Sequence, residues 1–177
     1  MINKFISDKN RNADAEKMLT DVFRTHFDSL FAYGLKISED KELVKDCIQE
    51  LFYRLWKNNT GAQNVNSMKF YLFKALRRQI LNAFDLKSFQ INKVSTDKII
   101  HFEISPEDLL IQNQTEKSQR ERILVALNQL SPRQREAVYL RYFEELDFRE
   151  TARIMDINVQ SAKNNVYRAL ETLKDIL

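Results

Sequence analysis

The side chains of this sequence that could do chemistry are amides, aromatic rings and cations, and they gather in two stretches. The first stretch contains Asn58, Asn59, Asn64, Lys69, Tyr71, Lys74, Arg77 and Arg78. The second, near the end of the sequence, contains Gln160, Ser161, Lys163, Asn164 and Arg168. Amides can hydrogen-bond to base edges, aromatic rings can stack on bases, and cations neutralise phosphates. A nucleic acid is one partner that such residue types suit, and a plain solvated surface is the alternative.

Groups that catalyse reactions or hold metal ions are scarce. Cys47 is the only cysteine, and the two histidines, His26 and His101, are far apart in the sequence. They cannot supply the Cys/His spacing of a zinc site. Two glycines in all leave no glycine-rich loop of the kind that cradles phosphates in nucleotide-binding domains. We expect a protein that is not an enzyme, with no catalytic residue, cofactor, metal ion or small-molecule substrate.

Composition predicts an all-α fold. A chain of 177 residues would on average contain roughly 20 glycines and prolines, yet this one has two of each. Sheet proteins need such residues at their turns, whereas 44% hydrophobic and 30% charged residues suit helices with one apolar face. The lone cysteine, and the absence of a signal peptide or of an apolar run of about 20 residues, favour a soluble, cytoplasmic protein.

Three stretches in the first half have helical periodicity. The first predicted helix covers residues 15–35 and could break at Gly34. The second begins near Ser38, whose hydroxyl can cap free amides. Its core stripe is Leu43, Val44, Cys47, Ile48, Leu51, Phe52 and Leu55. After a polar loop, the third helix opens at Ser67 and runs to about Phe84.

Periodicity fails between Asp85 and Ser105, which predicts a linker, and returns in the second half. Ser105 and Pro106 mark a helix start, and this helix could run as far as Leu130. Ser131 and Gln134 can form a capping box for the next helix. Two further helices, 148–155 and 159–176, are separated by three residues, as in a helix-turn-helix. We therefore expect two small helical domains, 1–87 and 106–177, joined by an acidic linker, 88–105; the second is a four-helix domain with a helix-turn-helix.

The formal net charge of +3 conceals an uneven distribution. Residues 69–88 contain five basic side chains and one acidic side chain, and residues 158–174 contain three and one. The intervening stretch, 89–119, has three basic and five acidic side chains. Because phosphates attract the first two segments and repel the third, we expect two separate contacts with nucleic acid.

The polar face of the second helix has two interpretations. Asp46, Gln49, Glu50 and Tyr53 lie three or four residues apart and so share one side of the helix. They could form an ordinary solvated face or a docking face for a basic or polar partner helix. Periodicity alone favours the solvated face.

Five segments of the sequence resemble, in the same order, motifs of the bacterial sigma factors of the extracytoplasmic-function group. Residues 46–56 (Asp-Cys-Ile-Gln-Glu-Leu-Phe-Tyr-Arg-Leu-Trp) are similar to the D-x-x-Q-E-x-F-x-x-L-W motif of this family, and residues 71–78 to its following aromatic and basic helix. Residues 127–136 (Leu-Asn-Gln-Leu-Ser-Pro-Arg-Gln-Arg-Glu) resemble the L-x-x-L-P-x-x-Q-R-E opening of its last domain. Residues 146–152 and 166–169 resemble its helix-turn-helix.

The resemblance implies a sigma region 2 and a sigma region 4, and a role for each group of side chains. In the family, the D-x-x-Q-E helix docks on the largest subunit of core RNA polymerase, so Asp46, Gln49, Glu50 and Tyr53 become the expected polymerase contacts. Trp56, an aromatic residue at helical spacing, is expected in the core. The loop after it corresponds to the one that holds a flipped base of the melted non-template strand, which makes Asn58, Asn59 and Asn64 candidates; a plain polar connector is the alternative.

The remaining basic residues correspond to the DNA-binding helices of the family. Lys69, Tyr71, Lys74, Arg77 and Arg78 match the helix beside the minus-ten element, with Phe70 or Phe73 in the core. The expected contacts to the minus-thirty-five element are Arg133, Arg149, Gln160, Ser161, Lys163, Asn164 and Arg168. Asp156 occupies a turn position where the family commonly has glycine, but aspartate tolerates a left-handed backbone. Ser161 and Ala162 replace the usual threonine and valine.

The sequence therefore predicts a sigma factor whose partners are core RNA polymerase and promoter DNA. An anti-sigma factor is a further candidate partner, because many family members are held inactive by one. The first alternative is a helix-turn-helix regulator that binds a palindromic duplex as a dimer. The second is a helical adaptor that binds only protein.

Overall fold

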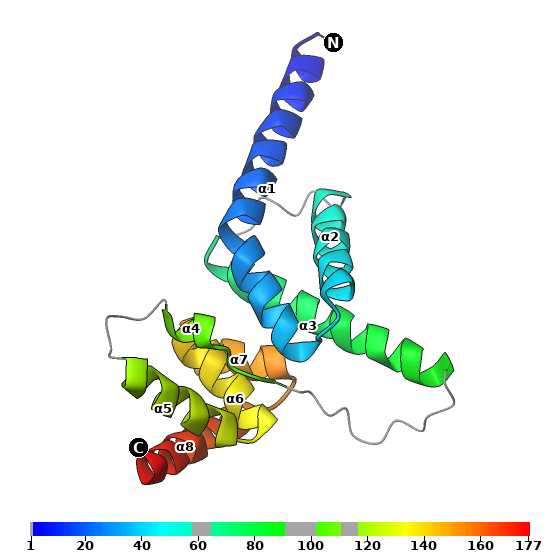
Figure 1. Cartoon of the computed structure of the whole chain (residues 1–177). Coiled ribbons are helices and arrows are strands. Elements are labelled where there is room, and N and C mark those ends of the chain that lie inside the picture. The colour runs from blue at the N-terminus through cyan, green and yellow to red at the C-terminus, as the bar shows by residue number, and fades with distance from the viewer. Residues whose placement is uncertain (1, 58–64, 91–101, 111–116) are drawn as a thin grey trace. The chain divides into compact units, whose positions relative to one another are not determined.

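The computed structural model describes residues 2–57, 65–90, 102–110 and 117–177, and every regular element in these ranges is a helix (Figure 1). The all-α prediction is confirmed. The chain divides into two compact units, Met1–Lys93 and Val94–Leu177, each with its own core. Within the described ranges, no helix is both long enough and apolar enough to cross a membrane.

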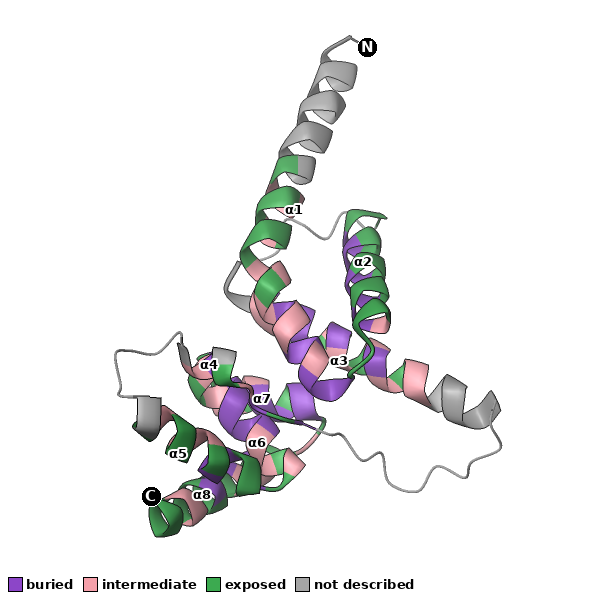
Figure 2. Cartoon of the chain, viewed as in Figure 1, coloured by how far each residue is buried: buried purple, intermediate pink, exposed green. Residues whose placement is uncertain are grey.

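The first unit consists of α1 (Ile2–Ile37), α2 (Lys41–Lys57) and α3 (Val65–Gln90), and each helix contacts the other two. Its core residues, purple in Figure 2, include Leu30, Tyr33, Val44, Ile48, Leu51, Leu72, Phe73, Leu76 and Ile80. Of the two phenylalanines considered for this core, Phe73 is fully buried and its ring lies 5.0 Å from that of Tyr33. Cys47 is also buried, as expected, and burial raises the pKa of its thiol, with Asp46 adding to the effect.

Helix α1 is not broken at Gly34 but continues to Ile37. Gly34 lies where α1 approaches α2, and a Cβ atom at this position would lie 2.5 Å from Val44 Cγ1. The glycine therefore permits close helix packing rather than ending the helix.

Helix α2 begins at Lys41, two residues later than a cap at Ser38 would place its start, and its cap is Asp40. Asp40 Oδ1 accepts from the amide of Leu43 at 3.1 Å, while Ser38 Oγ accepts from the amide of Asp40 at 3.3 Å. The buried Ser38 belongs to the end of α1, since its own amide donates to the Gly34 carbonyl. A carboxylate at the cap suits the positive end of the helix dipole.

Helix α3 is longer at both ends than its sequence pattern predicts. It starts at Val65 and continues to Gln90, beyond the expected end near Phe84 and into the predicted linker. No glycine or proline lies between Gly61 and Pro106 to stop it. Residues 91–101 of the predicted linker lie outside the described residues.

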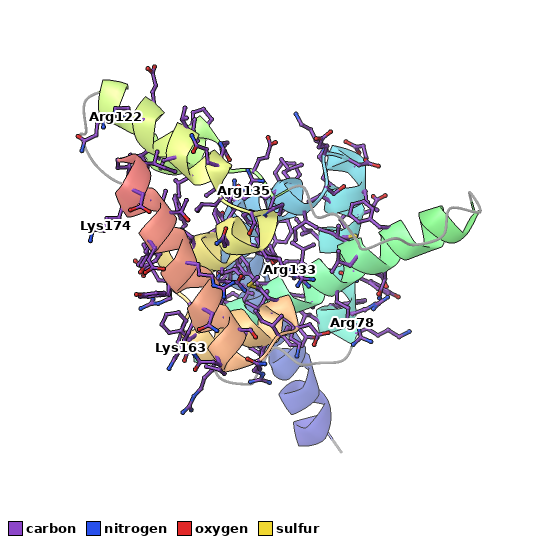
Figure 3. All side chains as sticks on the ribbon, turned by 90° about the horizontal axis from the view of Figure 1, so that it is seen from below. Arg78, Arg122, Arg133, Arg135, Lys163 and Lys174 are labelled. Atoms are coloured by element: carbon purple, nitrogen blue, oxygen red, sulfur yellow. The ribbon has the colours of Figure 1, made fainter. Side chains whose placement is uncertain are left out.

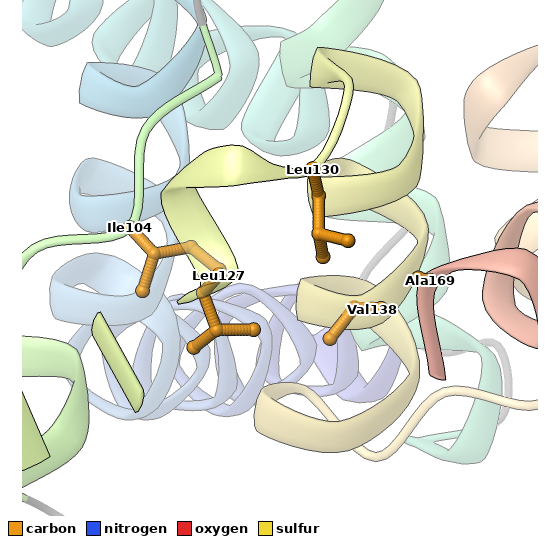
Figure 4. Close-up of a cluster of buried hydrophobic side chains, with 5 residues drawn as sticks. All are labelled: Ile104, Leu127, Leu130, Val138 and Ala169. Atoms are coloured by element: carbon orange, nitrogen blue, oxygen red, sulfur yellow. The ribbon is translucent and has the colours of Figure 1, made fainter. Parts of the chain in front are cut away.

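The second unit contains α4 (Pro106–Leu110), α5 (Lys117–Gln129), α6 (Pro132–Val138), the π-helix η2 (Tyr139–Phe143), α7 (Phe148–Met155) and α8 (Val159–Ile176). Helix α8 contacts α5, α6 and α7. A buried cluster lies among these helices and consists of Ile104, Leu127, Leu130, Val138 and Ala169 (Figure 4).

The last residues of the predicted linker belong to this core. Phe102 is fully buried, with its ring 5.6 Å from that of Tyr139, and Ile104 is a member of the buried cluster. Ser105 precedes α4 and donates from both its amide and its hydroxyl to Asp108 Oδ2, at 2.7 and 2.9 Å. Residues 102–105 are therefore part of the second unit rather than a connector.

The helix expected from Pro106 to Leu130 is described as α4 and α5, and residues 111–116 between them lie outside the described residues. The helix after it departs from the predicted pattern. Helix α6 passes into η2, where the Glu144 amide donates to the Tyr139 carbonyl five residues earlier, at 3.1 Å. Burial raises the pKa of the Tyr139 hydroxyl far above its usual range, and neighbouring Glu144 raises it further.

The local signals at the other helix ends are confirmed. Ser131 and Gln134 form the expected capping box, with hydrogen bonds of 2.9 and 3.4 Å. Helices α7 and α8 have the predicted boundaries of a helix-turn-helix. Asp156, between them, adopts the left-handed conformation with φ 57° and ψ 46°, and Asn158 caps α8 by accepting from the Ser161 amide at 2.7 Å.

Candidate nucleic-acid and partner interfaces

The exposed face of α8 contains most of the residues predicted to contact the upstream promoter element. The opposite face of α8 contains the buried residues Ala162, Val166 and Ala169. The helix contacts α5, α6 and α7. The exposed predicted residues are Gln160, Lys163, Asn164 and Arg168. Lys163 and Lys174 lie toward opposite ends of the helix (Figure 3). The first two turns thus present amides and a cation to solvent.

Two of these amides are already joined. Gln160 Nε2 donates to Asn164 Oδ1 at 3.0 Å, which is the i, i+4 pairing expected on a helix surface. Ser161 differs from its neighbours because it is half-buried and its amide is engaged with the Asn158 cap. Gln160 and Asn164 are therefore better placed than Ser161 to meet a partner.

Tyr167 is a surface residue on this face that the sequence pattern did not single out. It is 63% exposed and follows Lys163 by four residues and Asn164 by three. A side-chain hydrogen bond with Glu171, together with that residue's negative charge, raises the pKa of the tyrosine. The signal that could have found it is its spacing from the predicted base-reading residues.

The two arginines predicted outside α8 are also exposed. Arg149 lies in the first turn of α7 and Arg133 in the first turn of α6. Arg153, one turn after Arg149 on α7, is exposed as well, although the sequence analysis did not select it. The second unit thus presents cations from three helices.

The predicted DNA-binding residues of α3 divide into an exposed and a half-buried group. Tyr71, Lys74 and Arg78 are exposed and, at spacings of three and four, share one face of the helix. Lys69 and Arg77 are half-buried; the Lys69 ammonium lies 5.9 Å from the centre of the Phe73 ring. Lys74 lies 5.8 Å from the centre of the Phe70 ring, so a cation–π contact holds it at the surface.

The asparagine loop of the prediction is not described by the structure. Asn58, Asn59 and Asn64 lie outside the described residues. The adjoining residues Val65 and Asn66, which the prediction assigned to the loop, form the first turn of α3.

The polar face of α2 is exposed along its whole length. Asp46, Gln49, Glu50 and Tyr53 are all exposed, opposite the buried stripe. Glu50 Oε1 forms an ion pair with Arg54 Nε at 2.7 Å. The α2 face, as we define it here, consists of these four predicted residues together with Trp56.

The prediction that Trp56 lies in the core is wrong. Trp56 is 61% exposed, and its ring centre lies 6.2 Å from that of Tyr53, which is 53% exposed. The correct signal was present in the sequence, because Trp56 follows Gln49 by seven residues, or two helical turns, and so falls on the polar side. The α2 face therefore combines carboxylates at one end with two aromatic rings at the other.

No group of three or more His, Cys, Asp and Glu side chains in the described ranges is arranged to hold a metal ion. The exposed groups found here suit recognition through hydrogen bonds, stacking and charge.

Comparison with known proteins shows that most of the chain is similar to sigma factors. Residues 120–173 match the family model described as Sigma-70, region 4. The chain is 28% identical over 169 residues to the ECF RNA polymerase sigma factor BldN of Streptomyces coelicolor, covering 93% of this chain but only 61% of BldN. It is 22% identical over 157 residues to the ECF RNA polymerase sigma factor SigM of Bacillus subtilis, covering 88% of this chain and 93% of SigM.

A solved structure has the same fold. It is the sigma factor RpoE in complex with the anti-sigma factor NepR from Bartonella quintana, with a TM-score of 0.58 and 20% identity, covering 92% of this chain and 96% of that one. Together, these matches confirm the family resemblance predicted from the sequence motifs.

Proposed function

We propose that this chain, a relative of the extracytoplasmic-function sigma factors, binds core RNA polymerase in the cytoplasm and directs it to promoters. The first unit contacts polymerase and the melted minus-ten element, and the second unit reads the minus-thirty-five element. The chain itself performs no chemistry; it supplies sequence recognition to the polymerase.

The α2 face is the proposed contact with polymerase. Its exposed Asp46 and Glu50 attract a basic partner surface, while Tyr53 and Trp56 offer aromatic area of the kind that contributes strongly at protein interfaces. The buried stripe on the opposite side of α2 is held by α1 and α3. Docking through this face would therefore leave the core of the first unit intact.

The exposed face of α3 is the proposed contact with melted DNA. Lys74 and Arg78 would neutralise phosphates, and the ring of Tyr71 is available for stacking on an unpaired base. Asn58, Asn59 and Asn64 remain the proposed holders of a flipped base, because an amide can pair with a base edge.

Helix α8 is the observation that carries the proposal. It is the second helix of the helix-turn-helix, all but its last three residues lie within the segment that matches Sigma-70, region 4, and its first turns expose Gln160, Lys163 and Asn164. In this motif the beginning of the second helix enters the major groove. Arg133, Arg149 and Arg168 would hold the phosphates beside it. Because the sigma factor RpoE was solved with an anti-sigma factor, we include such a regulator among the proposed partners.

In vitro transcription with purified core polymerase and a library of promoters tests the proposal. The library varies the upstream and downstream elements independently, and the transcripts are sequenced. We expect protein-dependent start sites that share two spaced elements. Failure to bind core polymerase, or no protein-dependent initiation anywhere in the library, would contradict the proposal. Binding of a palindromic duplex by a dimer without polymerase would instead support the regulator alternative.

A further inference from the structure

The hydrogen bond between Gln160 and Asn164 determines which groups these side chains can offer to DNA. Gln160 Nε2 carries two hydrogens, and one of them points to Asn164 Oδ1, 3.0 Å away. The other hydrogen and the Oε1 atom, which accepts, take no part in this bond, and Gln160 is an exposed residue. Gln160 thus presents one donor and one acceptor side by side.

Of the four bases, adenine matches this pair of groups in the major groove. Adenine presents the acceptor N7 beside the donor N6, whereas guanine presents two acceptors, cytosine a donor and thymine an acceptor with a methyl group. An amide side chain therefore pairs with adenine through two hydrogen bonds. Lys163, the neighbouring exposed residue, has only donors and cannot make this distinction.

Asn164 restricts how the Gln160 amide is turned. Rotation of that amide alone by 180° would place Oε1 against Asn164 Oδ1, and two acceptors cannot share a hydrogen bond. The bond forms again only if the Asn164 amide also turns, so that its Nδ2 donates to Gln160 Oε1. The hydrogen bond therefore couples the orientations of the two amides and restricts the Gln160 side chain before DNA is bound. Pre-ordering of this kind lowers the entropy lost on binding.

We propose that Gln160 reads an adenine in the upstream promoter element and that Asn164 is a positioning residue acting through Gln160. This inference rests on the proposed function and deepens it by naming the base and the residue that selects it. The two side chains then behave as one unit, so their effects on base preference must fall at the same position of the element.

The test is in vitro transcription by the holoenzyme on a library in which every base of the upstream element is varied. We expect the unmodified protein to prefer adenine at one position by roughly ten- to a hundredfold, the range of a two-bond contact to a base. Gln160→Ala should abolish that preference, and Asn164→Ala should weaken it at the same position. The double variant should be no worse there than Gln160→Ala.

Three further variants sharpen the test. Gln160→Glu should move the preference at that position toward cytosine, because a carboxylate accepts from cytosine N4. Asn164→Asp, which keeps an acceptor oxygen, should retain the adenine preference that Asn164→Ala weakens. Arg168→Ala is the matched control and should lower transcription on all sequences without changing any base preference.

The outcomes separate this inference from the proposed function. If the unmodified holoenzyme initiates but Gln160→Ala leaves every upstream base preference unchanged, the inference is wrong. It is also wrong if Asn164→Ala acts at a different position from Gln160→Ala. If the unmodified holoenzyme initiates on no promoter, the proposed function fails and the inference fails with it.

Discussion

The side-chain amide of Asn128 holds the backbone of Ile104 through both of its groups. Asn128 Nδ2 donates to the Ile104 carbonyl at 3.0 Å, and Asn128 Oδ1 accepts from the Ile104 amide at 3.2 Å. Arg135 Nη1 in turn donates to the Asn128 carbonyl at 2.9 Å. The segment before α4 is thus fixed to α5 by the same kind of paired bonds that join neighbouring strands, although the described residues form no sheet there.

Asn128→Ala should release this segment. Loss of both bonds leaves the partly buried amide and carbonyl of Ile104 without their partners, which costs about 1–3 kcal/mol. Hydrogen exchange at the Ile104 amide should therefore accelerate, and the free energy of unfolding of the second unit should fall. Gln129→Ala, an exposed neighbour on α5, is the control. Unchanged exchange at Ile104 in the Asn128 variant would mean that burial alone holds the segment.

Gly34→Ala should destabilise the first unit, even though alanine favours helices by about 1 kcal/mol over glycine. The added Cβ would lie 2.5 Å from Val44 Cγ1, and overpacking of this kind typically costs about 1–3 kcal/mol. Hydrogen exchange of core amides in α1 and α2 measures the loss. In a Val44→Ala background the same change should be neutral or stabilising; an equal loss in both backgrounds would rule out the clash as its cause.

The turn of the helix-turn-helix should depend on residue 156 through its backbone. Asp156 has φ 57°, a region that costs a residue with a Cβ atom roughly 1–2 kcal/mol and a β-branched residue more. Asp156→Gly should therefore preserve or raise the free energy of unfolding of the second unit, and Asp156→Val should lower it. Thermal unfolding of the two variants gives this order, and the reverse order would contradict the assignment.

Charge reversal on the α2 face should weaken the complex with core polymerase. Asp46→Lys and Glu50→Lys replace exposed carboxylates, so the fold, followed by circular dichroism, should persist while affinity falls about tenfold or more. Asp28→Lys is the control, because Asp28 is an exposed carboxylate on α1 and its replacement changes the net charge by the same amount. Equal affinities for all three variants would remove the α2 face as the contact.

Alanine substitutions at Trp56 and at its neighbour Leu55 should distinguish a residue needed for binding to core polymerase from one needed for stability. Trp56 is 61% exposed and Leu55 is 3% exposed, so the same truncation to alanine should have opposite effects. Trp56→Ala should reduce affinity for core polymerase with little change in unfolding. Leu55→Ala should cost about 2–5 kcal/mol of stability through the cavity that it leaves. Loss of stability of that size in Trp56→Ala would restore the core assignment of the tryptophan.

Local rules accounted for much of the second unit. The Ser131 capping box, the boundaries of α7 and α8 and the left-handed Asp156 all depend on residues within four positions of one another, which the sequence displays directly. The exposed face of α8 that is proposed to read bases lies opposite the buried stripe of Ala162, Val166 and Ala169. Such features are predictable because the helix itself sets the spacing.

Where a side chain or a helix meets a distant element, the sequence pattern was insufficient. Phe102 and Ile104 have no helical periodicity and became core residues only because the second unit offers Tyr139 and the Asn128 amide to them.

By itself, the sequence determined that the chain is helical, where most of its helices lie and which polar residues gather on one side of each. The tertiary structure alone decided that Gly34 serves helix contact and that Phe102 and Ile104, shortly before α4, belong to the second core. The physical reason is range: helix formation depends on neighbours in sequence, whereas burial and close approach depend on surfaces contributed by residues far along the chain.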